Sequence, residues 1–496
     1  MHNFNVELYN RARTFKTVVP KLILSLKPFF LLTLLCCCFL GCADAQNAKP
    51  NGLREWTDSS GQYKVVAAYG GIVEGNVKLI KQVGKTVYVP VTRFSAADQQ
   101  YIQSLSSQTS VTPVPASLPH AKAGWTSFLG PNGNNTSSET GLIAEFPADG
   151  PKVLWKTELG TGFSGLTIGQ GKVFTLYGKG GRELVACFNA SNGRELWTFD
   201  SDADFSQGRS FGPRSTPLLD GKMLYAVGAS GRVVCLSAAN GKLVWDMNLY
   251  EKYSMEPHNE GLSPSPLIDG QNLIIAGGTS IFAFNKSNGQ LVWRALEEKF
   301  NHSTPTFATI EGKRQLVVLT GHNIVGLNPS DGEEFWRAEQ RGVNVATPVV
   351  TPDNQIFSAA AYGFGSQLIK VSGGSATRLY KNQALATHHA TAILHNGYLY
   401  GFHDRPGRLK CIKLENGEEQ WEDRSIEKGK MLMAEGRMYI LTEPGKLYIA
   451  PVSSTQFESS SMARILSGQS FTAPSLLDGI LYIRTDKEMA AIDLRK

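Results

Sequence analysis

The chain has 496 residues, of which 42% are hydrophobic and 19% are charged, and its formal net charge is +6. This length suits two or three ordinary domains or one large repeat domain, and the composition is that of a globular protein. No basic block of the kind that binds nucleic acid is present, so we expect no nucleic-acid partner.

The N-terminus carries an export signal. A basic stretch precedes the apolar run "FFLLTLLCCCFLGC", and its core from Phe29 to Leu40 is too short to span a bilayer comfortably. Cleavage after "ADA", before Gln46, would release the chain, whereas "FLGC" resembles a bacterial lipobox with Cys42 as the lipidated residue. An uncleaved anchor is a third alternative. Residues 1–45 therefore predict export to the periplasm or, through a lipid, to the outer membrane of a bacterium.

A small β module is predicted over residues 52–104. The segments "QYKVVAAY", "NVKLIKQ" and "KTVYVPV" alternate with period two and predict three antiparallel strands. Ser95 is a candidate N-cap for one short closing helix. The stretch resembles the SLA homology domain 1, an SH3-like module, in "REWTDSSG" (54–61), "GNVKL" (75–79) and "VPVTRFSAADQQYI" (89–102). That family binds short peptides in eukaryotic adaptors, a ligand we do not carry over.

Residues 105–123 are rich in Ser, Thr and Pro and show no apolar period. This composition is typical of a flexible to semi-extended linker. We therefore expect the small module and the following domain to be joined by a spacer.

A repeated phrase dominates the remainder, residues 124–496. It reads "SNGRELW" (191–197), "ANGKLVW" (239–245), "SNGQLVW" (287–293), "SDGEEFW" (330–336) and "ENGEEQW" (415–421), with Tyr380 in the Trp place of a degenerate copy. Spacings of 40 to 50 residues with several short strands per unit predict a β-propeller of four-stranded blades. The Trp falls on the outer strand, and the Asn-Gly pair predicts a type I′ hairpin with Gly241 at positive φ.

The repeats predict eight blades. The last unit, "FTAPSLLDGILYIRTDKEMAAIDLRK", stops one strand short, and "PKVLWKTEL" (151–159) has an outer-strand sequence without three preceding strands. Pairing 151–159 with 488–495 would close the ring and cover the exposed sheet edge. The pattern G-x-V-x-C/A-L-x-A-x-x-G-x-x-x-W resembles the pyrroloquinoline-quinone (PQQ)-like repeat, and the fold this implies is an eight-bladed all-β propeller.

The resemblance leaves the function open between classes. The propeller lipoproteins of the BamB family bind partner proteins through exposed loops without catalysis, and we favour such a binding or scaffold role toward an envelope protein or a small or polymeric ligand. PQQ-dependent dehydrogenases share the fold but hold a quinone with Ca²⁺ through carboxylate and amide oxygens. No vicinal Cys pair follows the signal and no haem motif is present, so we expect no cofactor, and PQQ with calcium only under the enzyme alternative. A ligand-binding propeller with a minor hydrolase or lyase activity is the third reading.

Candidate site residues lie just before the innermost strand of each blade, where loops converge on the propeller axis. They are Arg214, Ser263, His302, Asn344, His388, His389 and Lys430. They could form a polar or cationic funnel for an anionic group or, with the histidines, a metal, or they could merely cap loops and bind water. The loop "MEPHNEG" (255–261) adds Glu256, His258 and Glu260, but their order matches no known metal motif, so we expect a solvated loop and assign no metal site.

The cysteines of the propeller occupy one repeated slot. Cys187, Cys235 and Cys411 each lie six residues before the turn Gly of their repeat, where other repeats have Ala283 and Gly326. The slot therefore predicts a small buried side chain, a place that Cys fills well. A disulfide between Cys187 and Cys235 is the alternative, because export would permit it.

Overall fold

The computed structural model describes residues 53–73, 76–81, 86–107, 124–207 and 210–496. The chain divides into two compact units, Met1–Gln108 and Thr109–Lys496. The predicted export signal (1–45) and most of the predicted linker lie outside the described residues. Among the described residues, no helix combines the length and apolar character needed to cross a membrane.

The small unit is a four-stranded antiparallel sheet closed by a helix. Its strands, β1 (Leu53–Thr57), β2 (Lys64–Val73), β3 (Asn76–Lys81) and β4 (Thr86–Pro90), follow one another in the sheet, and η1 (Val91–Arg93) leads into α1 (Ala96–Ser107). The sequence predicted three strands, which is wrong by one. The missed strand, β1, pairs Trp56 with Val65 and places the indole in the core, 1% exposed.

The predicted N-cap of α1 is confirmed. Asp98 N–H donates to Ser95 Oγ at 3.2 Å, and the Asp98 carboxylate accepts hydrogen bonds from the Ser95 hydroxyl, the Thr57 N–H and the Arg54 guanidinium. This cap therefore also joins the helix to β1. The helix runs to Ser107, so residues 105–107 belong to it and not to the linker.

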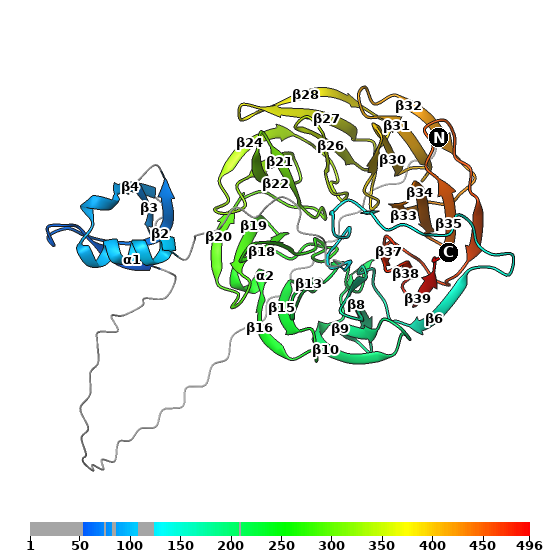
Figure 1. The fold of residues 1–496 in the computed structure, drawn as a ribbon, viewed down its shortest axis with the longest axis horizontal. Helices are drawn as coiled ribbons and strands as arrows, with labels where there is room; N and C mark the ends of the chain where they lie inside the picture. Colours follow the sequence, from blue (N-terminus) through cyan, green and yellow to red (C-terminus); the bar gives the residue numbers. More distant parts are fainter. Residues whose placement is uncertain (1–52, 74–75, 82–85, 108–123, 208–209) are drawn as a thin grey trace, which may run out of the picture. The chain divides into compact units, whose positions relative to one another are not determined.

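The large unit is a β-propeller whose described residues form eight blades of four antiparallel strands (Figure 1). Blades one to three are β7 (Thr167–Gly169), β8 (Lys172–Lys179), β9 (Arg182–Asn189), β10 (Glu195–Ala203); β13 (Leu218–Asp220), β14 (Met223–Val227), β15 (Arg232–Ser237), β16 (Leu243–Asn248); β17 (Leu267–Asp269), β18 (Asn272–Gly277), β19 (Ser280–Asn285), β20 (Leu291–Ala295). Blades four to six are β21 (Thr306–Ile310), β22 (Lys313–Leu319), β23 (Asn323–Leu327), β24 (Glu334–Glu339); β25 (Val349–Thr351), β26 (Gln355–Ala360), β27 (Gly365–Ser372), β28 (Ser375–Asn382); β29 (Ile393–His395), β30 (Tyr398–Phe402), β31 (Leu409–Lys413), β32 (Glu419–Asp423). Blade seven is β33 (Gly429–Ala434), β34 (Arg437–Thr442), β35 (Lys446–Pro451), β36 (Ser461–Arg464), and blade eight is β37 (Ser475–Leu477), β38 (Ile480–Arg484), β39 (Glu488–Asp493) and β6 (Lys152–Glu158). Short elements complete the unit: β5 (Thr136–Ser137), which pairs with β33, the ribbon β11 (Ser206–Gln207) and β12 (Ser210–Phe211), and α2 (Leu249–Lys252).

The two ends of the propeller sequence close the ring, as predicted. β6 pairs antiparallel with β39 in a register from Glu488↔Glu158 to Asp493↔Lys152. The Lys152 ammonium and the Asp493 carboxylate, 2.9 Å apart, reinforce the end of this ladder. Figure 1 shows β6 beside β39, and β6 is the fourth strand of the eighth blade.

The repeated Gly and Trp pack neighbouring blades against each other at four junctions. A Cβ on Gly241 would lie 2.6 Å from the indole of Trp197 in the preceding blade, and Gly193, Gly289 and Gly332 meet Trp155, Trp245 and Trp293 in the same way. Several of these indoles also donate to the backbone of the next blade, as Trp245 Nε1 does to Lys286 O at 3.0 Å. The repeated phrase is therefore an interface between blades.

The predicted type I′ geometry of these turns is wrong. A type I′ turn needs a positive φ at both central residues. Gly241 has φ +72°, but Asn240 is not among the described residues with a positive φ. Gly241 N–H donates to Ser237 O at 2.8 Å, and Asn240 Oδ1 accepts the Lys242 N–H at 3.2 Å. The Asn side chain thus ties the turn to its own backbone, and only the glycine needs a positive φ.

The cysteine slot is small and buried, as predicted. Cys187, Cys235 and Cys411 are at most 1% exposed, and all three are free thiols. Cys235 lies directly across the ladder from Trp245, and burial raises the pKa of its thiol to about 11. In the blade with Gly326, even a Cβ would lie 2.2 Å from the Trp336 indole, so the facing Trp sets the size limit.

Candidate functional site

A cavity of about 970 Å³ lies on the propeller axis, where the first strands of neighbouring blades contact one another. Six of the seven predicted residues line it: Arg214, Ser263, His302, His388, His389 and Lys430. Five precede the first strand of their blade, and Lys430 lies within β33. The structure therefore gathers residues from five blades around one space, whereas their function as a ligand site stays a prediction.

Asn344 is the member that the structure does not bring to this cavity. It is fully buried, and its side-chain amide donates to Thr320 O at 2.7 Å and to Gln340 O at 3.0 Å. Its backbone carbonyl accepts the His302 N–H at 3.3 Å. Asn344 thus holds the loop beside His302, which is the loop-capping alternative considered above.

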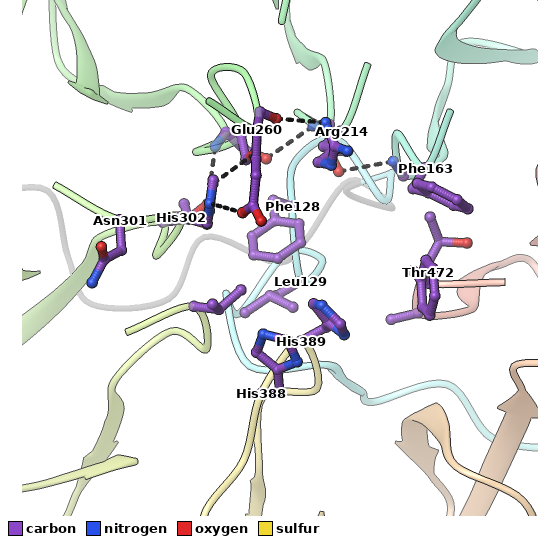
Figure 2. Close-up of a pocket in the computed structure, with 18 of the residues that line it drawn as sticks. Phe128, Leu129, Phe163, Arg214, Glu260, Asn301, His302, His388, His389 and Thr472 are labelled. Atoms are coloured by element: carbon purple, nitrogen blue, oxygen red, sulfur yellow. Dashed lines mark hydrogen bonds and ion pairs between the residues drawn. The ribbon is translucent and has the colours of Figure 1, made fainter. Parts of the chain in front are cut away.

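A segment that sequence reasoning left without a role crosses the axis. Trp125, Phe128 and Leu129 line the large cavity, and residues 126–133 line a second cavity of about 460 Å³. Figure 2 shows Phe128 and Leu129 between Glu260 and His302 on one side and His388 and His389 on the other. This segment has no apolar period. Its only signal was a cluster of Gly and Asn residues, and Leu129 indeed has φ +61°.

Glu260, His258 and His302 form one side of the cavity. His302 Nε2 lies 2.8 Å from Glu260 Oε2, and His302 Nδ1 lies 2.9 Å from Ser263 Oγ. The rings of His258 and His302 meet edge to face with centroids 4.4 Å apart. Glu260 is exposed, as expected of a solvated loop, but it is anchored where Arg214 Nη1 donates to its backbone carbonyl at 2.7 Å.

These contacts fix the charge of the group. The hydrogen bond from His302 lowers the pKa of Glu260 to about 2. Burial, with the neighbouring His302, lowers the pKa of His258 to about 4. At neutral pH, Glu260 is therefore ionised and His258 is a neutral imidazole.

The opposite side of the cavity carries two imidazoles in close contact. The rings of His388 and His389 lie 3.6 Å apart, and His389 lies 5.1 Å from the Phe471 ring. His388 Nδ1 is 3.4 Å from Asp404 Oδ1, and His388 Nε2 is 3.4 Å from the Tyr362 hydroxyl. Burial lowers the pKa of His388 to about 4, so this side offers aromatic faces and neutral imidazoles.

Arg214, Lys299 and Lys430 bring basic side chains to the cavity. The Lys430 ammonium makes no hydrogen bond or ion pair with any residue that the structure describes. Burial lowers its pKa to about 7, and the nearby Glu443 opposes that shift without forming a hydrogen bond or ion pair with the ammonium. An incoming carboxylate would supply the missing partner.

The cluster of metal-type donors on the cavity wall is not a calcium-type ligand set. Ca²⁺ prefers six to eight oxygen ligands, whereas the clustered metal-type donors in the described part of the cavity are two imidazoles and one carboxylate. The three described cysteines lie inside blades and do not line the cavity.

Two family models match the chain. Residues 181–423 match the family described as outer membrane protein assembly factor BamB, and residues 44–110 match SLA1 homology domain 1. No curated protein matches the sequence. These two matches confirm the resemblances that the repeats and the small module carry.

Solved structures show the same fold at low identity. BamB from Moraxella catarrhalis is 15% identical with a TM-score of 0.50, over 68% of this chain and 97% of that chain. Quinohemoprotein alcohol dehydrogenase from Comamonas testosteroni is 12% identical with a TM-score of 0.56, over 75% of this chain and 80% of that chain. Sqt1 from Saccharomyces cerevisiae is 11% identical with a TM-score of 0.52, over 70% of this chain and all of that chain. Such likeness establishes the propeller but does not choose between binding and catalysis.

Proposed function

Because the chain joins an SLA1 homology domain 1 to a PQQ-like repeat propeller of the BamB type, we propose that it is an exported, non-catalytic binding protein whose axial cavity takes a carboxylate-bearing ligand. The observation that carries this proposal is the unpaired Lys430 ammonium in a cavity that also holds Arg214. A hydrogen bond to a charged group contributes about 1.5–3 kcal/mol.

Aromatic side chains line the cavity and would contact the apolar part of such a ligand. Phe163 and Phe471 meet edge to face with ring centroids 4.7 Å apart, and Tyr362 and Phe128 also line the space. Flat apolar faces with a few convergent polar groups are typical of ligand sites. A volume of about 970 Å³ accommodates a ligand of about trisaccharide size.

The test is calorimetric titration of the purified full chain with two carboxylate probes, citrate and trigalacturonate, and with neutral maltotriose. We expect at least one carboxylate probe to bind saturably and maltotriose not to bind. Arg214→Gln and Lys430→Gln should each weaken binding about 10- to 100-fold. The matched control Lys222→Gln removes an exposed charge outside the cavity and should change nothing. Absence of binding by both carboxylate probes, or binding insensitive to Arg214→Gln and Lys430→Gln, would overturn the proposal.

The enzyme alternative needs its own experiment. The full chain is titrated with PQQ, with and without Ca²⁺, beside a dye-linked alcohol oxidation assay. The proposal requires that no turnover accompany any PQQ binding. Calcium-dependent binding with turnover would establish a quinoprotein and refute the non-catalytic role.

The proposed binding role includes a cellular location and a protein partner. The signal-like residues 1–45 and the match to an outer membrane protein assembly factor support a location in the periplasm, or at the outer membrane through a lipid on Cys42. In this role, the propeller would bring its ligand to an envelope protein that is the second partner.

A further inference from the structure

We propose that His258, Glu260 and His302 form a binding site for a divalent transition-metal ion, with Zn²⁺ as the reference ion. One ligand atom from each of the three side chains lies within 4.8 Å of the other two. His258 and Glu260 come from the loop after α2, and His302 comes from the loop before β21 of the next blade. The site therefore exists only because two consecutive blades meet at the axis.

The donor set suits zinc. Two imidazoles and one carboxylate, with a fourth position open to solvent or ligand, form the ligand set of many open zinc sites. Bonds of about 2.0–2.1 Å in a tetrahedral arrangement place donor atoms roughly 3.3 Å apart. The 2.8 Å from His302 Nε2 to Glu260 Oε2 and the 4.8 Å limit of the group bracket that spacing, so side-chain shifts of about 1 Å complete the site.

The surroundings of His302 orient it as a metal ligand. In the metal-free chain Nε2 donates to Glu260 Oε2 at 2.8 Å, so an ion must displace that proton. Nδ1 lies 2.9 Å from Ser263 Oγ and can then carry the ring proton and donate it to this hydroxyl. A second hydrogen-bonding partner of this kind accompanies most metal-bound histidines and sets their tautomer. His258 Nδ1 accepts the Glu260 N–H at 3.2 Å. Metal binding through this atom would exchange that long contact, together with the hydrogen bond between His302 and Glu260, for metal bonds.

Nearby positive charge decides what the fourth ligand is. Arg214 donates to the Glu260 carbonyl, and Lys299 also lines the cavity. Both charges oppose a bare dication but favour an anion at its open position. A ligand carboxylate bound there would contact the ion and Arg214 together. This last step rests on the proposed function, whereas metal binding itself does not.

The test is binding of Zn²⁺ to the metal-free full chain, measured by calorimetry and by the metal content after equilibrium dialysis. We expect one ion per chain. His258→Ala and His302→Ala should each weaken the affinity more than about 100-fold, and Ser263→Ala about 10-fold. The control His322→Ala removes an exposed histidine outside the cavity and should leave the affinity unchanged. Co²⁺ in place of Zn²⁺ should give visible absorption bands that His302→Ala abolishes, a signature that a purely structural role would not produce.

Two results would overturn the metal site: no saturable Zn²⁺ binding, or binding that survives both His258→Ala and His302→Ala. Unfolding curves recorded in EDTA verify that the variants fold. Trigalacturonate titrations with and without Zn²⁺ keep the two proposals separate. Ligand binding without any zinc binding would refute only the metal site, and zinc binding with no binding of either trigalacturonate or citrate would refute only the ligand proposal.

Discussion

Glu183 shows how a single buried group can set a pH dependence. The side chain is 0% exposed, and its Oε2 accepts the Ala229 N–H at 3.2 Å. Burial, opposed by that hydrogen bond and reinforced by Asp202 and Asp204, raises its pKa to about 8. The folded protein therefore keeps Glu183 protonated at neutral pH, and the unfolded chain does not.

Replacing Glu183 by Gln should remove this pH dependence. A carboxyl whose pKa is raised on folding stabilises the protein fully below its unfolded pKa, near 4.5, and the stabilisation disappears as the pH rises through about 8. One unit of pKa corresponds to about 1.4 kcal/mol. The free energy of unfolding of Glu183→Gln should therefore be a few kcal/mol higher than that of the wild type at pH 8, and the two should be equal near pH 4.5. Denaturant unfolding across this range measures the difference, with the exposed Glu158→Gln as control. Parallel wild-type and Glu183→Gln profiles would refute the assignment.

At the scale of the element, the turn of each blade is both a hairpin and a contact surface. Gly241 has φ +72°, and a Cβ there would lie 2.6 Å from Trp197 Cε3. Gly221, in the turn between β13 and β14, has φ +55°, but a Cβ there would meet nothing within 4 Å. The two glycines share the backbone requirement and differ only in packing.

Gly241→Ala and Gly221→Ala therefore form a matched pair. Both substitutions place alanine in the left-handed region, at about 1–2 kcal/mol, and Gly241→Ala adds about 1–3 kcal/mol of overpacking against the indole. We expect Gly241→Ala to lower the free energy of unfolding clearly more than Gly221→Ala, measured by denaturant titration. Equal losses in the free energy of unfolding for the two variants would mean that the blade interface accommodates the added methyl group, and would contradict this prediction.

Two features at this scale, the strand β1 and the type of the Asn-Gly turns, were not predicted correctly from the sequence patterns. Period-two alternation identified β2 to β4 but not β1, because Leu53–Thr57 mixes Arg54 and Glu55 with apolar residues, and only its pairing with β2 makes it a strand. The Asn-Gly pairs located the turns correctly. They did not specify the turn type, because Asn240 satisfies its side chain locally instead of adopting a positive φ.

At the scale of the whole molecule, the chain consists of two units with separate cores. Trp56 centres the core of the small unit with Phe94, Ile102 and Leu79. The cores of the propeller lie between its blades, and the core that joins blades seven, eight and one includes Trp155 and residues from both ends of the propeller. Each unit therefore has the means to fold by itself.

Calorimetry of the full chain should show two unfolding transitions. Trp56→Ala should abolish the smaller transition or shift it to lower temperature, because removing a buried Trp costs about 3–5 kcal/mol. The larger transition should remain in place. The converse variant, Trp336→Ala, should shift only the larger transition. A single transition that both substitutions move would show that the two units unfold as one.

The sequence by itself determined the repeat, the eight blades, the closure by residues 151–159 and the small slot of the cysteines. These features follow from periodicity and spacing, which act within one blade or between identical interfaces. Only the tertiary structure decided the site. In the structure, His258 and Glu260 lie beside His302 from the next blade. Asn344 does not line the cavity. Phe128 and Leu129 lie across the axis. Irregular loops carry no period, and their contacts depend on how the closed ring orients each blade, so residues about forty positions apart meet without any local signal.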